Sequence, residues 1–148
     1  MNPKQQAAFQ ALSQVQSGMV LGLGTGTTAS YFIDLLGERL RTKTLQDISG
    51  VPTSEETARR AHAAGIPLTS LAEHPRLDLA VDGADEVDTN LNLIKGLGRA
   101  LLREKIVEVH ADFFLVVADE SKLVPYLGRG PLPVEILPFG AEATVRWL

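Results

Sequence analysis

Apolar positions along the chain fall into two kinds of pattern, short continuous runs and helical spacings, which alternate. Short apolar runs at 19–21, 45–51, 77–81 and 113–118 are typical of buried strands. Helical spacings or start signals predict a helix over 3–17, before the first run, and helices over 27–41, from 53 onward and over about 97–109, between the later runs. Strands that alternate with helices in this way predict an α/β fold with a mainly parallel sheet and helices on both faces.

The last segment of the chain departs from this pattern. The run GRGPLP at 128–133 interrupts the alternation, and after it 134–137 is typical of a strand and 141–148 of the opening of a helix. Because a helix that stops without a cap leaves carbonyl groups unsatisfied, we expect the sequence to be cut short there. We therefore predict one Rossmann-like domain over 1–130, followed by a separate segment over 131–148.

Composition narrows the classes of function. The chain has 148 residues, of which 45% are hydrophobic and 22% charged, enough for one globular domain. A formal net charge of -4 disfavours attraction to nucleic acid or anionic membranes. There is no cysteine, no signal peptide and no apolar stretch of the ~18 to 20 residues that span a membrane. We expect a cytoplasmic protein whose partners include neither nucleic acid nor a membrane.

A loop rich in glycine and threonine, GLGTGTT at 22–28, joins the first predicted strand to the helix after it. Glycines let a ligand approach the backbone, and the amides at a helix N-terminus attract anions. The hydroxyls of Thr25, Thr27 and Thr28 add donors. The loop lacks the third glycine of the dinucleotide motif and the Lys-Ser/Thr of a P-loop, so it favours a sugar phosphate or mononucleotide over NAD. A tight turn capped by threonine is the alternative.

Four carboxylates follow the predicted strand at 77–81, in the motif VDGADEVD at 81–88. They fall at the carboxyl end of that strand, where open α/β sheets bind ligands. Asp82 and Asp85 together with Lys95 suit proton transfer, because carboxylates move protons and an ammonium stabilises a developing oxyanion. Clustered acids also suit magnesium, although Lys95 in the same site would repel a cation. A solvated acidic loop is the remaining alternative.

Glu104 stands among apolar residues of the helix predicted over 97–109. A helical wheel places it beside Leu97, Leu101 and Val107. Burial there would raise the pKa of its carboxyl above the ~4.3 of a free glutamate, toward the range of a base at neutral pH. An exposed glutamate paired with a neighbouring basic residue is the alternative.

Taken together, the motifs resemble the ribose-5-phosphate isomerase A family, in order along essentially the whole chain. The resemblance is carried by GLGTGTTA, VDGADEVD, IKG at 94–96, ALLREKI at 100–106, VADESK at 117–122 and PLPVE at 131–135. It implies reversible conversion of D-ribose 5-phosphate to D-ribulose 5-phosphate in the non-oxidative pentose phosphate pathway, by a homo-oligomer (dimer or tetramer) without metal or other cofactor. It also implies that 131–148 is the incomplete beginning of a second, small α/β domain.

The resemblance further assigns roles to individual residues. Glu104 is implied as the base that moves a proton from C2 to C1, with Asp82 and Asp85 assisting ring opening and hydroxyl proton traffic. Lys95 is implied to stabilise the enediolate oxygen. The residues implied at the substrate are Lys4, Thr25, Gly26, Thr27, Thr28, Gly83, Ala84, Gly96, Leu97, Gly98 and Lys122.

The sequence departs from the family after the lysine, where relatives usually have a run of small residues. Here Leu97 and Arg99 stand in that run. Two other functions stay open, a sugar-phosphate sensor of the same fold and a chain that folds without activity. The presence of the whole set Asp82, Asp85, Lys95 and Glu104 favours catalysis, because a sensor does not need all four.

Overall fold

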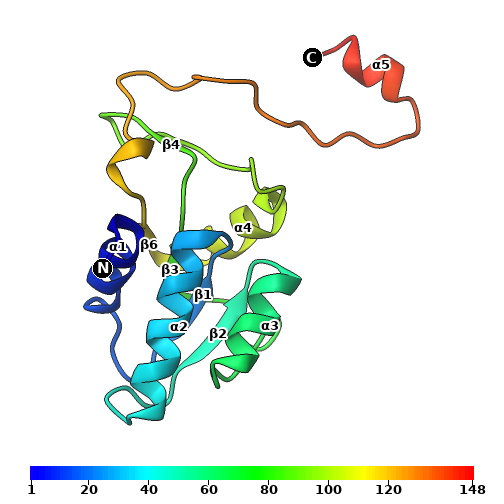
Figure 1. Cartoon of the computed structure of the whole chain (residues 1–148). Helices are drawn as coiled ribbons and strands as arrows, with labels where there is room; N and C mark the ends of the chain where they lie inside the picture. Colours follow the sequence, from blue (N-terminus) through cyan, green and yellow to red (C-terminus); the bar gives the residue numbers. More distant parts are fainter.

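A parallel sheet forms the centre of the computed structural model, which describes residues 1–148. Its four strands lie in the order β2-β1-β3-β6 (Figure 1). They are β1 (Val20–Leu23), β2 (Ser49–Pro52), β3 (Leu77–Asp82) and β6 (Ala111–Val116). Every neighbouring pair is parallel, which confirms the predicted fold class.

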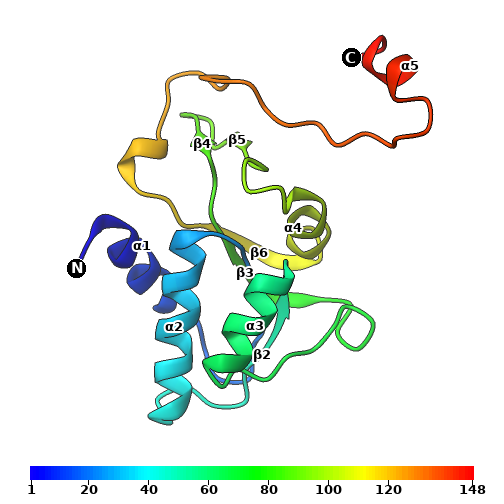
Figure 2. The ribbon, with the colours of Figure 1, turned by 45° about the vertical axis from the view of Figure 1, so that its right-hand side comes forward.

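Helices cover both faces of this sheet. One face carries α1 (Pro3–Leu12), α2 (Thr27–Arg41) and α3 (Glu55–Ala63), and the other carries α4 (Leu101–Glu108). Figure 2 shows α2 and α3 side by side. Alternate residues of β1 explain the two layers, since Leu21 and Leu23 join the main core under α1 and α2, whereas Gly22 faces Val107 of α4. None of the helices has the length and apolar character needed to cross a membrane.

Local signals set the ends of the helices. Asn2 caps α1 through a capping box with Gln5, and Ser54 caps α3 by accepting a hydrogen bond from the backbone N–H of Thr57. The predicted start near 53 is therefore confirmed, and α2 has the predicted bounds of 27–41. Gly65, with φ +76, follows the end of α3 in the left-handed conformation that glycine favours.

Several predicted boundaries are wrong by a few residues. The helix predicted over 3–17 ends at Leu12, and the strand predicted from 45 begins at Ser49. The largest difference is α4, which begins at Leu101 and not near 97. Gly96 and Arg99 have φ of +100 and +61, a left-handed backbone that an α-helix cannot contain. Leu97 and Ala100 therefore precede the helix.

A short hairpin that the sequence did not predict stands above the sheet. It consists of β4 (Glu86–Val87) and β5 (Leu93–Ile94), which pair antiparallel. The 3-10 helix η1 (Glu120–Lys122) leads from β6 past this hairpin. The buried carboxylate of Glu86 accepts hydrogen bonds from the backbone N–H groups of Gly128 and Arg129, and so holds the departing chain against the hairpin.

The segment 131–148 extends away from the sheet (Figure 1). The strand predicted over 134–137 is absent, because these residues have no neighbouring strand to pair with, and all of them except the half-buried Ile136 are exposed. The helix predicted from 141 is present as α5 (Ala141–Val145). Large apolar side chains in this segment are almost fully exposed, Phe139 at 95% and Trp147 at 86%.

The contact between α2 and α3 depends on a glycine. A Cβ atom on Gly37 would lie 2.5 Å from the carbonyl oxygen of Ala64 and 2.7 Å from its Cβ atom. We expect Gly37→Ala to lower the free energy of unfolding by about 1 to 2 kcal/mol, although alanine by itself favours a helix by about 1 kcal/mol. Urea denaturation measures this, with the exposed neighbour Glu38→Ala as control within about 0.5 kcal/mol of wild type. A Gly37→Ala chain as stable as wild type would contradict the close packing.

Candidate active site

The site lies at the carboxyl ends of β1 and β3. From these two adjacent strands the chain turns to opposite sides of the sheet, which is where open α/β sheets bind ligands. The backbone N–H of Gly24 donates to the carbonyl of Val81 (2.9 Å), and that of Thr25 donates to Oδ1 of Asp82 (3.1 Å). A Cβ atom on Gly24 would lie 2.3 Å from the carboxylate carbon of Asp82, so only glycine allows this approach.

A cavity of about 230 Å³ opens at these strand ends. All but two of the predicted site residues line it, the exceptions being Asp82 and Leu97. The predicted residues that line it are Lys4, Thr25, Gly26, Thr27, Thr28, Gly83, Ala84, Asp85, Lys95, Gly96, Gly98, Glu104 and Lys122. The structure therefore brings together residues that lie as far apart in the sequence as Lys4 and Lys122.

One side of the cavity is suited to an anion. The first turn of α2 places the amides of Thr27 and Thr28 there, and Lys4 and Lys122 reach the same cavity from α1 and η1. Helix N-termini and lysine ammonium groups both favour negative charge. Gly26, with φ +105, makes the turn from strand to helix in a conformation that other residues rarely adopt.

A cluster of hydroxyl groups holds the glycine-rich loop at 22–28 in place. The hydroxyl of Thr25 lies 2.7 Å from that of Thr53, 2.9 Å from that of Ser54 and 3.2 Å from that of Thr57. Thr53 and Thr57 in turn donate to the carbonyls of Leu23 and Gly24. The hydroxyl of Thr25 is thus bonded to the scaffold, and its residue meets the cavity through the backbone and the rest of the side chain. The sequence did not indicate this cluster.

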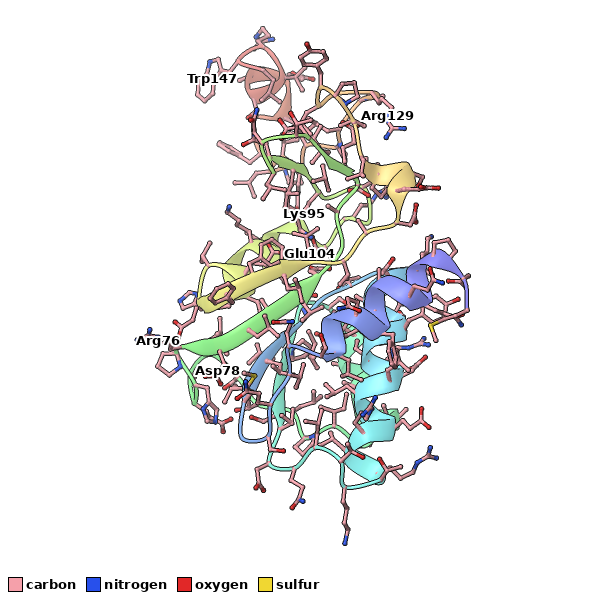
Figure 3. All side chains as sticks on the ribbon, turned by 90° about the vertical axis from the view of Figure 1, so that its left-hand side faces the viewer. Arg76, Asp78, Lys95, Glu104, Arg129 and Trp147 are labelled. Carbon is pink, nitrogen blue, oxygen red and sulfur yellow. The ribbon has the colours of Figure 1, made fainter.

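The other side of the cavity holds a buried cluster of one ammonium and three carboxylates. Nζ of Lys95 lies 3.4 Å from Asp82, 3.3 Å from Glu104 and 3.2 Å from Glu108, and all four side chains are less than a tenth exposed. Lys95 also donates to the carbonyl of Gly83. Figure 3 shows Lys95 and Glu104 close together between the sheet and the β4–β5 hairpin.

Burial and mutual repulsion hold protons on this cluster. Burial raises the pKa of Glu104, and Lys95 offsets only part of that rise. Burial also raises the pKa of Asp82 to about 7, against the attraction of Lys95 and with a further rise from Glu104 and Glu108. Burial alone would lower the pKa of Lys95, but the three carboxylates outweigh it and raise that pKa. Lys95 therefore stays charged, while Asp82 and Glu104 keep their protons to higher pH than exposed acids do.

The same three carboxylates have the composition of a metal site. One oxygen from each of Asp82, Glu104 and Glu108 lies within 4.8 Å of the others. The ammonium of Lys95, however, contacts all three and supplies the positive charge that a cation would bring. The chemistry of this set of residues therefore favours proton transfer over metal binding.

A hydrogen bond between Asp85 and the backbone of Leu97 fixes the loop after Lys95. The backbone N–H of Leu97 donates to Oδ2 of Asp85 (3.0 Å), while the side chain of Leu97 is 52% exposed and outside the cavity. Asp85 lines the cavity without joining the ion pairs of Lys95. Arg99 has a left-handed backbone and does not line the cavity.

Sequence reasoning missed four residues of the site. Glu108 follows Glu104 by one helical turn, and this spacing of two acids was the available signal. Ala29, Val117 and Ala118 also line the cavity. Val117 and Ala118 follow the end of β6, the third strand to reach this edge, so the rule that ligands bind at carboxyl ends of strands could have found them.

Together, the sheet and the cavity define a Rossmann-like domain whose site combines an anion-binding side with a proton-transfer side. Residues 49–148 match the family model described as ribose 5-phosphate isomerase A (phosphoriboisomerase A). The chain belongs to this family, as the motifs predicted.

Individual relatives support the assignment along nearly the whole chain. The chain is 61% identical over 143 residues to ribose-5-phosphate isomerase A of Rhodopseudomonas palustris (strain BisB5), covering 97% of this chain and 61% of the relative. A solved D-ribose-5-phosphate isomerase in complex with phospho-erythronic acid superposes with a TM-score of 0.95 at 49% identity, covering 99% of this chain and 66% of that one. The enzyme from Methanocaldococcus jannaschii gives 0.92 at 46% identity, over 97% and 64% of the two chains.

The chain spans 61% and 62% of the length of two relatives from Rhodopseudomonas palustris, strains BisB5 and TIE-1.

The hydroxyl cluster leads to a test of stability. We expect Thr25→Val, which keeps the shape of the side chain, to lower the free energy of unfolding by about 1 to 3 kcal/mol, because buried hydroxyls lose their shared partner. Thr25→Ser, which keeps the hydroxyl, is the matched control and is expected to stay within about 1 kcal/mol of wild type. Urea denaturation compares the two, and equal stability of both variants would contradict a structural role for the hydroxyl.

The raised pKa of Asp82 makes stability depend on pH. The folded chain holds this proton up to about pH 7, whereas the unfolded chain loses it near the ordinary value of 3.8. The folded state therefore binds more protons between these values, and the free energy of unfolding falls as pH rises through that window. We expect Asp82→Asn, which cannot ionise, to flatten this decline in urea denaturation at a series of pH values. Exposed Glu38→Gln should keep the wild-type slope, and an unchanged slope in Asp82→Asn would contradict the assignment.

Proposed function

We propose that this chain carries the catalytic part of an aldose–ketose isomerase that interconverts D-ribose 5-phosphate and D-ribulose 5-phosphate. The observation that carries the proposal is the position of Glu104, a buried carboxylate that lines the cavity and pairs with Lys95 at its inner end. The relatives described above support the choice of substrate, because they are named ribose-5-phosphate isomerases.

The phosphate group of the substrate binds at the anion side of the cavity in this proposal. The amides at the start of α2 and the ammonium groups of Lys4 and Lys122 provide its donors and positive charge. With the phosphate held there, the aldehyde end of the open-chain sugar extends toward Lys95 and Glu104. This orientation places the carbons that react beside the proton-transfer side of the site.

Glu104 acts as the base. It takes the proton from C2, and the electron pair of the broken C–H bond forms the C1–C2 double bond of an enediolate, with negative charge on O1. Lys95 stabilises that oxygen. The proton then returns to C1, and the proton of the C2 hydroxyl passes to O1, so that C2 becomes the ketone carbon and C1 carries a hydroxyl. The raised pKa of Glu104 matters here because it makes this carboxylate a stronger base than that of an exposed glutamate.

Asp82 and Asp85 handle the protons on oxygen. Asp82 lies outside the cavity lining and contacts Lys95, so it acts through that ammonium, and with a pKa of about 7 it can accept and return a proton near neutral pH. Asp85 lines the cavity from the loop between β3 and β4, where it can assist opening of the sugar ring. The reaction moves only protons and an electron pair within the substrate, so the proposal requires no metal, nucleotide or redox cofactor.

The larger assembly is also part of the proposal. Exposed apolar side chains on 131–148, together with Phe113 of β6 at 74% exposure, support a second domain that begins in this segment and a homo-oligomeric protein. A cytoplasmic location stays a prediction from the sequence.

Glu104→Gln tests the role of the base. An amide keeps the shape of the side chain and loses its basicity, so we expect kcat to fall at least about 100-fold while sugar-phosphate affinity changes little. The assay follows conversion of ribose 5-phosphate by the 148-residue chain, and calorimetry with phospho-erythronic acid, the ligand of the solved relative, measures binding. Glu38→Gln serves as control.

Unchanged turnover in Glu104→Gln would refute the assignment of the base. A wild-type chain that binds the phosphorylated acid but converts no ribose 5-phosphate would refute the isomerase function of this chain and favour a sugar-phosphate sensor.

A further inference from the structure

Glu108 is the member of the buried cluster that the proposed mechanism does not use. It lies one turn after Glu104 on α4, and its residue is 8% exposed. Its Oε1 atom is 3.2 Å from Nζ of Lys95, the shortest of the three carboxylate contacts. Glu104 lines the cavity and Glu108 does not, so Glu108 holds the ammonium from the side away from the substrate. Position 108 also lies beyond the ALLREKI motif that marks the family.

The fold by itself gives no reason for a third carboxylate here. Buried ionised groups are unfavourable unless paired, and two acids already surround one ammonium before Glu108 is added. With all three ionised, the cluster carries an excess of two negative charges. An apolar side chain at 108 would pack beside Val107 without this repulsion, so the position of Glu108 points to a role in the site.

The contacts of Lys95 show what Glu108 changes. The ammonium donates a hydrogen bond to the carbonyl of Gly83 and forms ion pairs with three carboxylates. Oε1 of Glu108 has no hydrogen-bond partner of its own, so its only compensation is the charge of Lys95, for which it competes with Glu104. Without Glu108, Glu104 is the nearest carboxylate to the ammonium, and a base that is held tightly by an ammonium is a weaker base.

We propose that Glu108 is a positioning residue for the isomerisation, which holds the ammonium of Lys95 at the rear of the site and limits its pairing with Glu104. This inference rests on the proposed function for its catalytic meaning. Its structural content, the competition of two glutamates on one helix face for one ammonium, can be measured without substrate.

The charges around Glu108 agree with this role. Lys95 from the loop, Asp82 from β3 and Glu104 from its own helix face it, and Asp85 acts on Glu104 from the loop after β3. The centroid of the Phe114 ring, on β6, lies 5.8 Å from Nζ of Lys95. The charge of Glu108 contributes to the raised pKa of Glu104 and of Asp82. Its removal therefore lowers both values, with Lys95 still present as the attracting charge.

The test compares Glu108→Gln and Glu108→Ala with wild type and with the exposed control Glu38→Gln. Both variants at 108 relieve repulsion among buried acids, so we expect them to fold, as judged by circular dichroism. The first readout is the titration of the Glu104 carboxyl by carbon-13 NMR without substrate. We expect its midpoint to fall by about one pH unit in both variants and to stay unchanged in Glu38→Gln.

The second readout is the pH profile of kcat for ribose 5-phosphate. We expect the acid limb in the variants at 108 to move to lower pH by about the same one unit, and kcat on the plateau to fall about threefold with little change in KM. A structural role alone would lower kcat with loss of folded protein and would not move the limb.

The two readouts separate the two proposals. An unmoved Glu104 midpoint in Glu108→Gln and Glu108→Ala overturns the positioning role, even if the chain isomerises its substrate. A moved midpoint with an unmoved pH profile overturns it as well. If the midpoint moves in both variants at 108 while the wild-type chain converts no ribose 5-phosphate, the result supports the competition for Lys95 and overturns the proposed function instead.

Discussion

The pairing of one buried ammonium with three buried carboxylates is the interaction on which the rest of the site depends. Lys95 joins three parts of the fold, because Asp82 ends β3, Glu104 and Glu108 belong to α4, and Lys95 itself follows β5. Since buried charges are tolerated only when paired, the sheet, the hairpin and the helix must meet correctly for any of these groups to stay ionised. Burial of the cluster raises the pKa of Asp82 and of Glu104 against the attraction of Lys95, and makes both groups useful for moving protons.

The parallel sheet supplies the geometry that this cluster needs. β1 and β3 are neighbours that send the chain to opposite sides, so the anion side and the carboxylate side of the cavity arise from adjacent strand ends. Gly24 brings the threonine loop against Asp82, and the hydroxyls behind Thr25 hold it there. A ligand held between the two sides is therefore close both to fixed positive charge and to exchangeable protons.

The sequence predicted the order of strands and helices because burial and helical spacing are local signals, and 27–41 was correct at both ends. It also predicted that Glu104 is buried, but for an incomplete reason. Leu97 precedes the helix, and the carboxylate of Glu104 lies 3.3 Å from Lys95 in the charged cluster. The hairpin β4–β5 and the place of Glu108 depend on contacts between distant residues, which spacing does not reveal. The strand expected at 134–137 failed for a related reason, since a strand forms only with a partner.

Exchange of substrate hydrogen with solvent tests the central claim most directly. The 148-residue chain is incubated with ribose 5-phosphate in deuterium oxide, and proton NMR follows the hydrogen on C2 of the sugar together with the C1 hydrogens of the product. If the Lys95 cluster moves protons as described, deuterium enters both positions as the aldose and ketose interconvert. A chain that binds the sugar phosphate at saturation and leaves the C2 hydrogen in place would contradict the account.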